Sequence, residues 1–144
     1  MPEPELPRPT YLVKQLQEAM RLRLAGITEQ FGLTTRQYTT LSVLAQYPNI
    51  SSAQLARLTF VSPQAANEMV ATLERKRLLS RSVDADNRRR VKVRVTRAGT
   101  DTLSKCDALV DGLEAEVFRG LAPRDRAHFH RMLQTCLDAI TERP

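Results

Sequence analysis

The chain has 144 residues, of which 42% are hydrophobic and 26% charged, proportions typical of a single folded domain. Its longest uninterrupted apolar run is three residues, which excludes a membrane-spanning helix and a signal-peptide core, so we expect a cytoplasmic protein. The formal net charge is +6, but the window from Arg75 to Arg97 holds ten basic residues against two aspartates and alone carries +8. Such a compact cationic patch favours a polyanionic partner, most commonly nucleic acid.

The first predicted elements are three helices. Apolar residues recur at steps of three and four along the first segment, which predicts a helix over residues 10–32. Two capping boxes, Thr34 with Gln37 and Ser51 with Gln54, then predict the starts of two short helices. In a capping box the hydroxyl accepts a hydrogen bond from a free backbone N–H, and the glutamine reaches back to the cap residue.

The sequence Ser62-Pro63 predicts the start of a fourth helix, because a hydroxyl caps the end and proline suits the first helical position. Apolar residues follow one face of this helix, and the opposite face is small or polar. Gln64 and Asn67 on that face can each bond the edge of adenine with two hydrogen bonds. The alternative is an ordinary solvated helix face. The residues predicted to contact DNA from this helix are Ser62, Pro63, Gln64, Ala65, Asn67 and Glu68.

After Leu79 the apolar period changes from 3.6 to 2, which predicts a β-hairpin with strands at 80–83 and 91–95. We expect the arginines at its tip to bind phosphate or enter a minor groove; they are Arg88, Arg89 and Arg90. Asp84 and Asp86 have the same sign of charge as DNA. One of them is expected to brace an arginine or to close the turn as an Asx motif. The alternative for the whole segment is a solvated basic hairpin.

Two further helices complete the chain. Thr96 is predicted to cap a long helix whose apolar residues follow a heptad seam, and a break at 120–123 precedes a last amphipathic helix. These stripes exceed what one small module needs to bury, which predicts a homodimer; the alternative is a monomer that buries them internally. The predicted dimerisation residues are Leu12, Leu16, Leu113, Val117, Leu133, Leu137 and Ile140.

Catalytic and metal-binding signatures are missing from the sequence. Cys106 and Cys136 are too few for a disulfide framework or a four-ligand zinc site, and we expect both to be packing residues. His128 and His130 are two residues apart on a predicted helix and point to different sides of it. No phosphate-binding glycine loop or zinc-protease motif is present. We therefore expect neither an enzyme nor a cofactor or metal.

The order of elements, two short helices, a capped helix with a polar face and a basic hairpin, predicts a winged helix-turn-helix. The expected fold is mainly α with a small β-hairpin wing, a DNA-binding module over 34–97 and dimerisation helices over 10–32 and 99–142. Four segments stand in this order: Thr34-Thr-Arg-Gln-Tyr-Thr-Thr-Leu, Ser51-Ser-Ala-Gln-Leu-Ala, Leu73-Glu-Arg-Lys-Arg-Leu-Leu and Val93-Arg-Val-Thr-Arg-Ala-Gly. Together with the order of elements, they resemble the MarR-type (multiple-antibiotic-resistance) regulators.

The resemblance implies a homodimer that represses nearby genes from a palindromic operator and is often released by a small phenolic or lipophilic ligand. Wings of this family carry an Asp-x-Arg turn, which Asp86 with Arg88 fits; counted back from Thr96, the pair is instead Asn87 with Arg89. Arg77 stands where the family commonly has glycine. Since non-glycine residues rarely adopt a positive φ, the exit from the fourth helix is expected to differ.

Two minor sets of residues complete the predicted sites. Phosphate contacts are expected from Ser51, Ser52 and Arg75, and an effector pocket near Arg21, Tyr38 and Tyr47. The sequence thus predicts a repressor that binds double-stranded DNA sequence-specifically. The alternative is an architectural protein that binds DNA without regard to sequence.

Overall fold

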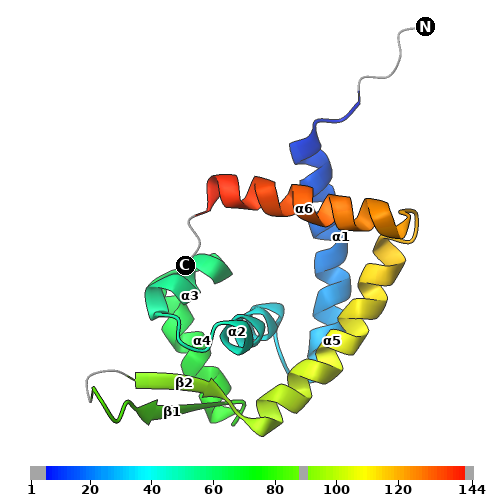
Figure 1. Ribbon diagram of the computed structural model, residues 1–144. Coiled ribbons are helices and arrows are strands. Elements are labelled where there is room, and N and C mark those ends of the chain that lie inside the picture. Colours follow the sequence, from blue (N-terminus) through cyan, green and yellow to red (C-terminus); the bar gives the residue numbers. More distant parts are fainter. Residues whose placement is uncertain (1–5, 88–90, 142–144) are drawn as a thin grey trace, which may run out of the picture.

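The computed structural model describes residues 6–87 and 91–141, which form six helices and one antiparallel hairpin (Figure 1). The elements are α1 (Pro9–Glu29), α2 (Thr35–Gln46), α3 (Ser52–Thr59), α4 (Pro63–Arg75), β1 (Leu79–Val83), β2 (Val91–Val95), α5 (Arg97–Val117) and α6 (Pro123–Ile140). The predicted fold class, mainly α with a hairpin wing, is confirmed. Over the described residues, no helix is both long and apolar enough to cross a membrane.

Local hydrogen bonds fix where the three short helices begin. Thr34 Oγ1 accepts from the backbone N–H of Gln37 at 3.1 Å, and Gln37 Oε1 accepts from the N–H of Thr34. Ser51 and Gln54 form the same pair of bonds at the start of α3. Ser62 Oγ accepts from the N–H of Ala65 at the start of α4. The sequence itself therefore sets the first residue of α4, whose outer face is the candidate recognition surface.

One apolar core holds α2, α3, α4 and the hairpin together. Leu41 of α2, Ala66 and Leu73 of α4 and Cys106 of α5 have no exposed surface. The core therefore continues from the winged module into α5. Cys106 is a packing residue, as expected, and burial raises the pKa of its thiol, with a smaller contribution from Asp107.

The hairpin is joined to the first turn of α5. Its register pairs Leu79 with Val95, so β1 begins one residue earlier than predicted. Thr96 caps α5 by accepting from the N–H of Gly99, and its hydroxyl donates to the carbonyl of Arg77 at 2.7 Å. A Cβ added at Gly99 would lie 2.2 Å from the carbonyl oxygen of Leu78. This close approach needs glycine and fixes the angle at which α5 leaves the wing.

Three helices end in a left-handed residue, only one of which is glycine. The angle φ is +69° at Gly32, +55° at Phe60 and +60° at Arg77. At each, two backbone hydrogen bonds close the helix end in the pattern of a Schellman motif. Phe60 and Arg77 thus flank α4 with turns for which glycine is the usual residue.

The expectation that Arg77 avoids a positive φ is wrong. The N–H of Leu78 donates to the carbonyl of Leu73 at 3.0 Å, and that of Arg77 to Glu74 at 2.9 Å. Leu78 and Leu79, which follow this turn, are both buried. The backbone bonds and this burial offset the steric cost of the left-handed residue, so α4 ends in the tight turn despite the arginine.

The helices α1, α5 and α6 lie outside the winged module (Figure 1). Several of their apolar side chains are exposed. Arg23 of α1 forms two hydrogen bonds to the carboxylate of Glu116 on α5. In α6 no residue is buried. Of the predicted dimerisation residues, Leu113 is buried within its own chain, and Leu16 and Val117 are half-buried. The exposed ones are Leu12, Leu133, Leu137 and Ile140.

Candidate nucleic-acid interface

The outer face of α4 presents the side chains that were predicted to read bases. Gln64, Asn67 and Glu68 are exposed, while the opposite face of the helix packs into the core. Gln64 Nε2 lies 3.5 Å from Glu68 Oε1, a weak contact that leaves the amide available. Ser62 and Pro63 form the start of the helix, and Ala65 is half-buried. The exposed polar side chains of the predicted set beyond the helix cap are therefore Gln64, Asn67 and Glu68.

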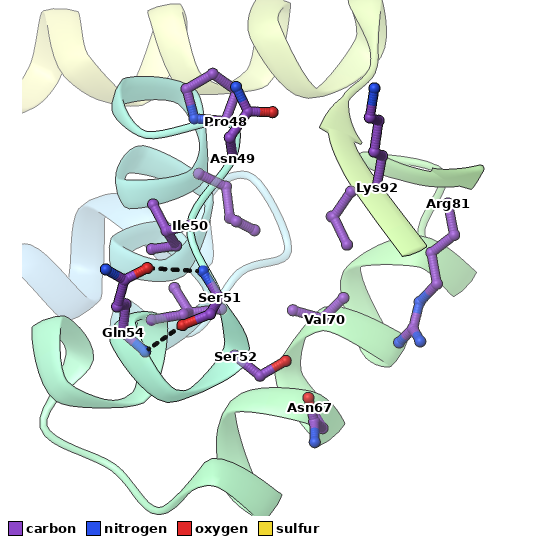
Figure 2. A pocket seen from close by; sticks show the side chains of 13 residues that line it. Pro48, Asn49, Ile50, Ser51, Ser52, Gln54, Asn67, Val70, Arg81 and Lys92 are labelled. Atoms are coloured by element: carbon purple, nitrogen blue, oxygen red, sulfur yellow. Dashed lines mark hydrogen bonds between the residues drawn. The ribbon is translucent and has the colours of Figure 1, made fainter. Parts of the chain in front are cut away.

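A hollow of about 340 Å³ lies beside α4, between the start of α3 and the hairpin (Figure 2). Ser52 and Asn67 point toward each other at its edge, and Arg81 of β1 points toward α4. Ser51 also lines the hollow, but its Oγ already accepts the N–H of Gln54 as a helix cap. Of the two predicted phosphate-binding serines, Ser52 is therefore the one whose hydroxyl the cap leaves unused.

The remaining cations at the end of α4 have different partners. Arg75, the third predicted phosphate contact, is exposed and donates from Nη2 to Thr72 Oγ1 at 2.9 Å. Lys76 donates to the carbonyl of Gly32 and to Gln37 Oε1, which ties the end of α4 to the α1–α2 turn. Arg75 is therefore bonded only within its own helix, among the bonds that the structure shows, whereas Lys76 links α4 to another part of the fold.

In the wing, the structure bears on the aspartates but not on the tip. Arg88, Arg89 and Arg90 lie outside the described residues. Asp84 is only 8% exposed, and its Oδ1 accepts from the N–H of Asp86 at 3.0 Å, the geometry of an Asx turn. Its Oδ2 lies 3.6 Å from Lys92 Nζ. Asp84 thus closes the turn, which is one of the two roles expected for these aspartates.

The ion pair between Arg81 and Glu74 was not predicted from the sequence. Arg81 Nε lies 2.7 Å from Glu74 Oε2, and both side chains are about 40% exposed. The one sequence feature that pointed to Arg81 is its place in the basic window from Arg75 to Arg97, on the strand that follows α4. Sequence alone did not reveal that a glutamate of α4 lies opposite it.

The three predicted effector residues are not assembled into one pocket by the single chain. Arg21 is exposed on α1 and pairs with Glu18 at 2.8 Å. The Tyr38 hydroxyl donates to Asp107 Oδ1 at 2.6 Å, and burial, with a smaller effect of this bond, raises the pKa of Tyr38. Tyr47 caps the other end of α2, nine residues from Tyr38 and thus about 14 Å along the helix. An effector site that uses all three would need further groups.

The order α2–α3–α4–β1–β2, with a capped and outwardly polar α4, defines a winged helix-turn-helix protein. Comparisons with known proteins agree. The model described as MarR family matches residues 31–90. The HTH-type transcriptional repressors Rv2887 of Mycobacterium tuberculosis and Mb2911 of Mycobacterium bovis are each 29% identical to this chain over 124 residues, or 86% of this chain and 89% of the relative.

Solved structures extend the likeness to nearly the whole chain. The M. tuberculosis MarR family protein Rv2887 in complex with salicylic acid has 27% identity and a TM-score of 0.75, covering 92% of this chain and 98% of that one. Its complex with DNA has 26% identity and a TM-score of 0.74, covering 91% and 98%. Wild-type MarR from E. coli, at 21% identity, 92% and 98% coverage and a TM-score of 0.76, shows the same fold. The chain is therefore similar to MarR family proteins over most of its length.

Proposed function

We propose that this protein is a transcriptional repressor that binds double-stranded DNA sequence-specifically, as a homodimer on a palindromic operator. The observation that carries the proposal is the exposed amide face of α4, with Gln64 and Asn67 beside a basic wing. Relatives named transcriptional repressors, and the structure of Rv2887 with DNA, support it. The proposed role also implies that the protein is not an enzyme. It further implies that the protein acts in the cytoplasm, where the chromosome lies.

In the proposed complex α4 lies in the major groove. A helix of about 10–12 Å diameter fits a groove about 12 Å wide, and residues of its first turns reach base edges. Gln64 and Asn67 would bond adenine through N6 and N7. Ser52 and Arg75 would bind phosphate, while the wing arginines at 88–90 would reach phosphate or the minor groove.

The second copy of the chain would cover the apolar face of α6. Leu137 and Ile140 line, with Phe60 of the α3–α4 turn, an apolar hollow of about 400 Å³. Leu12 of α1 and Leu133 of α6 are also exposed. Two modules related by a two-fold axis would read half-sites about one helical turn, ~34 Å, apart.

A small phenolic or lipophilic effector would release the DNA. The complex of Rv2887 with salicylic acid supports a ligand of this class. The effector would bind between the dimerisation helices and the winged module, near Arg21, Tyr38 and Tyr47, with the second protomer supplying the missing walls. It would act only if it binds the DNA-incompetent dimer more tightly than the DNA-competent one.

Selection of bound duplexes from a random pool tests the function. We expect a palindrome whose half-site centres are about 10 bp apart, which would support the dimer and specific binding together. Equal binding to selected and random duplexes in ~0.15 M salt would overturn the proposal, and steep salt dependence alone would not rescue it. That outcome, with loss of binding on changing hairpin arginines but not Gln64 or Asn67, would indicate an architectural DNA-binding protein.

A further inference from the structure

The hollow beside α4 is lined by a cation, Arg81, that forms an ion pair with an acidic residue of α4. Arg81 reaches toward α4 from β1 (Figure 2). Its Nε lies 2.7 Å from Glu74 Oε2. Ser52 and Asn67 supply a hydroxyl and an amide at the same hollow. These donors come from α3, α4 and β1, so the folded module brings together groups that are distant in sequence.

The way in which Arg81 is paired leaves its strongest donors available. A guanidinium carries five N–H donors, and the ion pair with Glu74 has its closest approach at Nε. The two terminal nitrogens form the planar fork that matches the oxygens of a phosphate. Because both side chains are about 40% exposed, the pair contributes little to stability and the fork is accessible to a ligand.

The position of Glu74 relates this fork to the DNA. Glu74 follows Asn67 by seven residues, two helical turns, so both lie on the same side of α4. A cation held on that side, next to a helix lying in the major groove, lies at the edge of the groove where the phosphates are. We propose that Arg81 binds a phosphate of the DNA backbone and that Glu74 is the positioning residue that orients its guanidinium.

This inference rests on the proposed function, since it names a backbone contact of the same complex. A phosphate contact carries no sequence information, so its loss lowers the affinity for every duplex by a similar factor. It also releases fewer counterions, which reduces the slope of log affinity against log salt by about one. Base contacts have neither signature.

The test measures the binding of a selected duplex and of a random duplex by fluorescence anisotropy at salt concentrations from about 50 to about 300 mM. The slope of log affinity against log salt then reports the number of phosphate contacts. Arg81→Ala should weaken binding of both duplexes by about tenfold and lower the salt slope by about one. Arg81→Lys should keep the slope, because the charge remains, and lose part of the affinity with the fork. Arg23→Ala, which breaks an arginine–glutamate pair between α1 and α5, is the matched control and should leave the slope unchanged.

The role of Glu74 is isolated by comparing two variants. Glu74→Ala and Glu74→Gln both remove the negative charge, but only glutamine keeps a side-chain oxygen able to accept a hydrogen bond from Arg81. We expect Glu74→Gln to bind both duplexes more tightly than Glu74→Ala, and this difference to vanish in the Arg81→Ala background. Equal binding of the two variants would overturn the positioning role.

Thermal unfolding of each variant separates a folding defect from a lost contact. If the wild type prefers its selected duplex but folded Arg81→Ala keeps the wild-type slope, the phosphate contact is refuted and the proposed function stands. If Arg81→Ala weakens only the selected duplex, Arg81 contacts a base and the inference is again overturned. If the wild type prefers no sequence, the proposed function fails, whereas a lower slope in Arg81→Ala would still show the phosphate contact.

Discussion

The hydroxyl of Tyr38 donates a 2.6 Å hydrogen bond to Oδ1 of Asp107, and this bond joins α2 of the winged module to α5. The spacing of two DNA-reading modules in a dimer depends on how each module sits on its long helix. The Tyr38–Asp107 bond therefore lies where a small change in the angle between α2 and α5 would change the spacing of the two modules in the proposed complex with DNA.

Replacing Tyr38 by phenylalanine should remove this bond with little change in packing. We expect a loss of about 1–2 kcal/mol in the free energy of unfolding, because a hydrogen bond to a carboxylate at a half-buried site is lost. Urea unfolding at neutral pH measures it. Tyr11→Phe, an exposed tyrosine on α1, is the control and should change stability by less than about 0.5 kcal/mol.

The contribution of Tyr38 should also depend on pH. Burial and the bond to Asp107 raise the pKa of Tyr38 above the ordinary value of 10.0. As pH rises, the unfolded chain loses the phenol proton first, so this stabilisation is complete below about pH 10 and is lost as pH rises through the folded-state pKa. The stability difference between wild type and Tyr38→Phe should be constant from about pH 7 to 9 and shrink by pH 11. A constant difference over the whole range would refute this assignment.

Gly99 should tolerate no side chain. An alanine Cβ would lie 2.2 Å from the backbone oxygen of Leu78, so the first turn of α5 would have to move off the hairpin. We expect Gly99→Ala to cost about 1–3 kcal/mol in thermal or urea unfolding. Gly26→Ala, within α1 and with open space around its Cα, should instead be neutral or stabilising by up to about 1 kcal/mol.

Arg77 carries backbone strain that glycine would relieve. Its φ of +60° is unfavourable for any residue with a Cβ. Arg77→Gly should therefore raise the free energy of unfolding by about 0.5–1 kcal/mol, after the greater freedom of the unfolded glycine is deducted. The same substitution at Arg75, which is helical, should lower it by up to about 1 kcal/mol. Equal effects at the two positions would mean that the left-handed turn stores no strain.

The predictable parts of this fold are those determined by neighbouring residues. Thr34, Ser51, Ser62 and Thr96 cap their helices as the sequence indicates, because each cap needs only an N–H three residues away. Arg77 was not predictable in this way. Its left-handed turn is stabilised by leucines whose burial depends on helices elsewhere in the chain.

In the candidate site, too, features set by neighbouring residues were predictable and contacts between different elements were not. Gln64 and Asn67 could be assigned to an outer face because the period of one helix separates them from Ala66 and Leu73. The pairs Arg81–Glu74 and Tyr38–Asp107 join different elements, so no local pattern contains them. The sequence therefore predicts the exposed polar face of α4 correctly but does not predict these contacts between elements.

A charge on the apolar face of α6 should prevent dimerisation. Ile140 is 84% exposed in the single chain, so Ile140→Glu would be harmless in a monomer. In a dimer that covers this face, it would bury an unpaired carboxylate, and we expect dissociation at micromolar concentration. Light scattering measures the mass. Arg131→Glu, on the opposite side of the same helix, should remain dimeric. A wild type that is monomeric would contradict the dimer.

Gln64 and Asn67 should determine sequence preference without contributing to general affinity. Each alanine variant should lose about 1–3 kcal/mol of discrimination at one base pair of each half-site, since a bidentate amide–adenine contact is removed. Neither amide is charged, so binding to random duplex and the salt slope should not change. Competition with operators substituted one base pair at a time measures the discrimination. Gln30→Ala, an exposed glutamine at the end of α1, should leave every preference intact. If both α4 variants keep the wild-type preferences, α4 does not read bases through these amides.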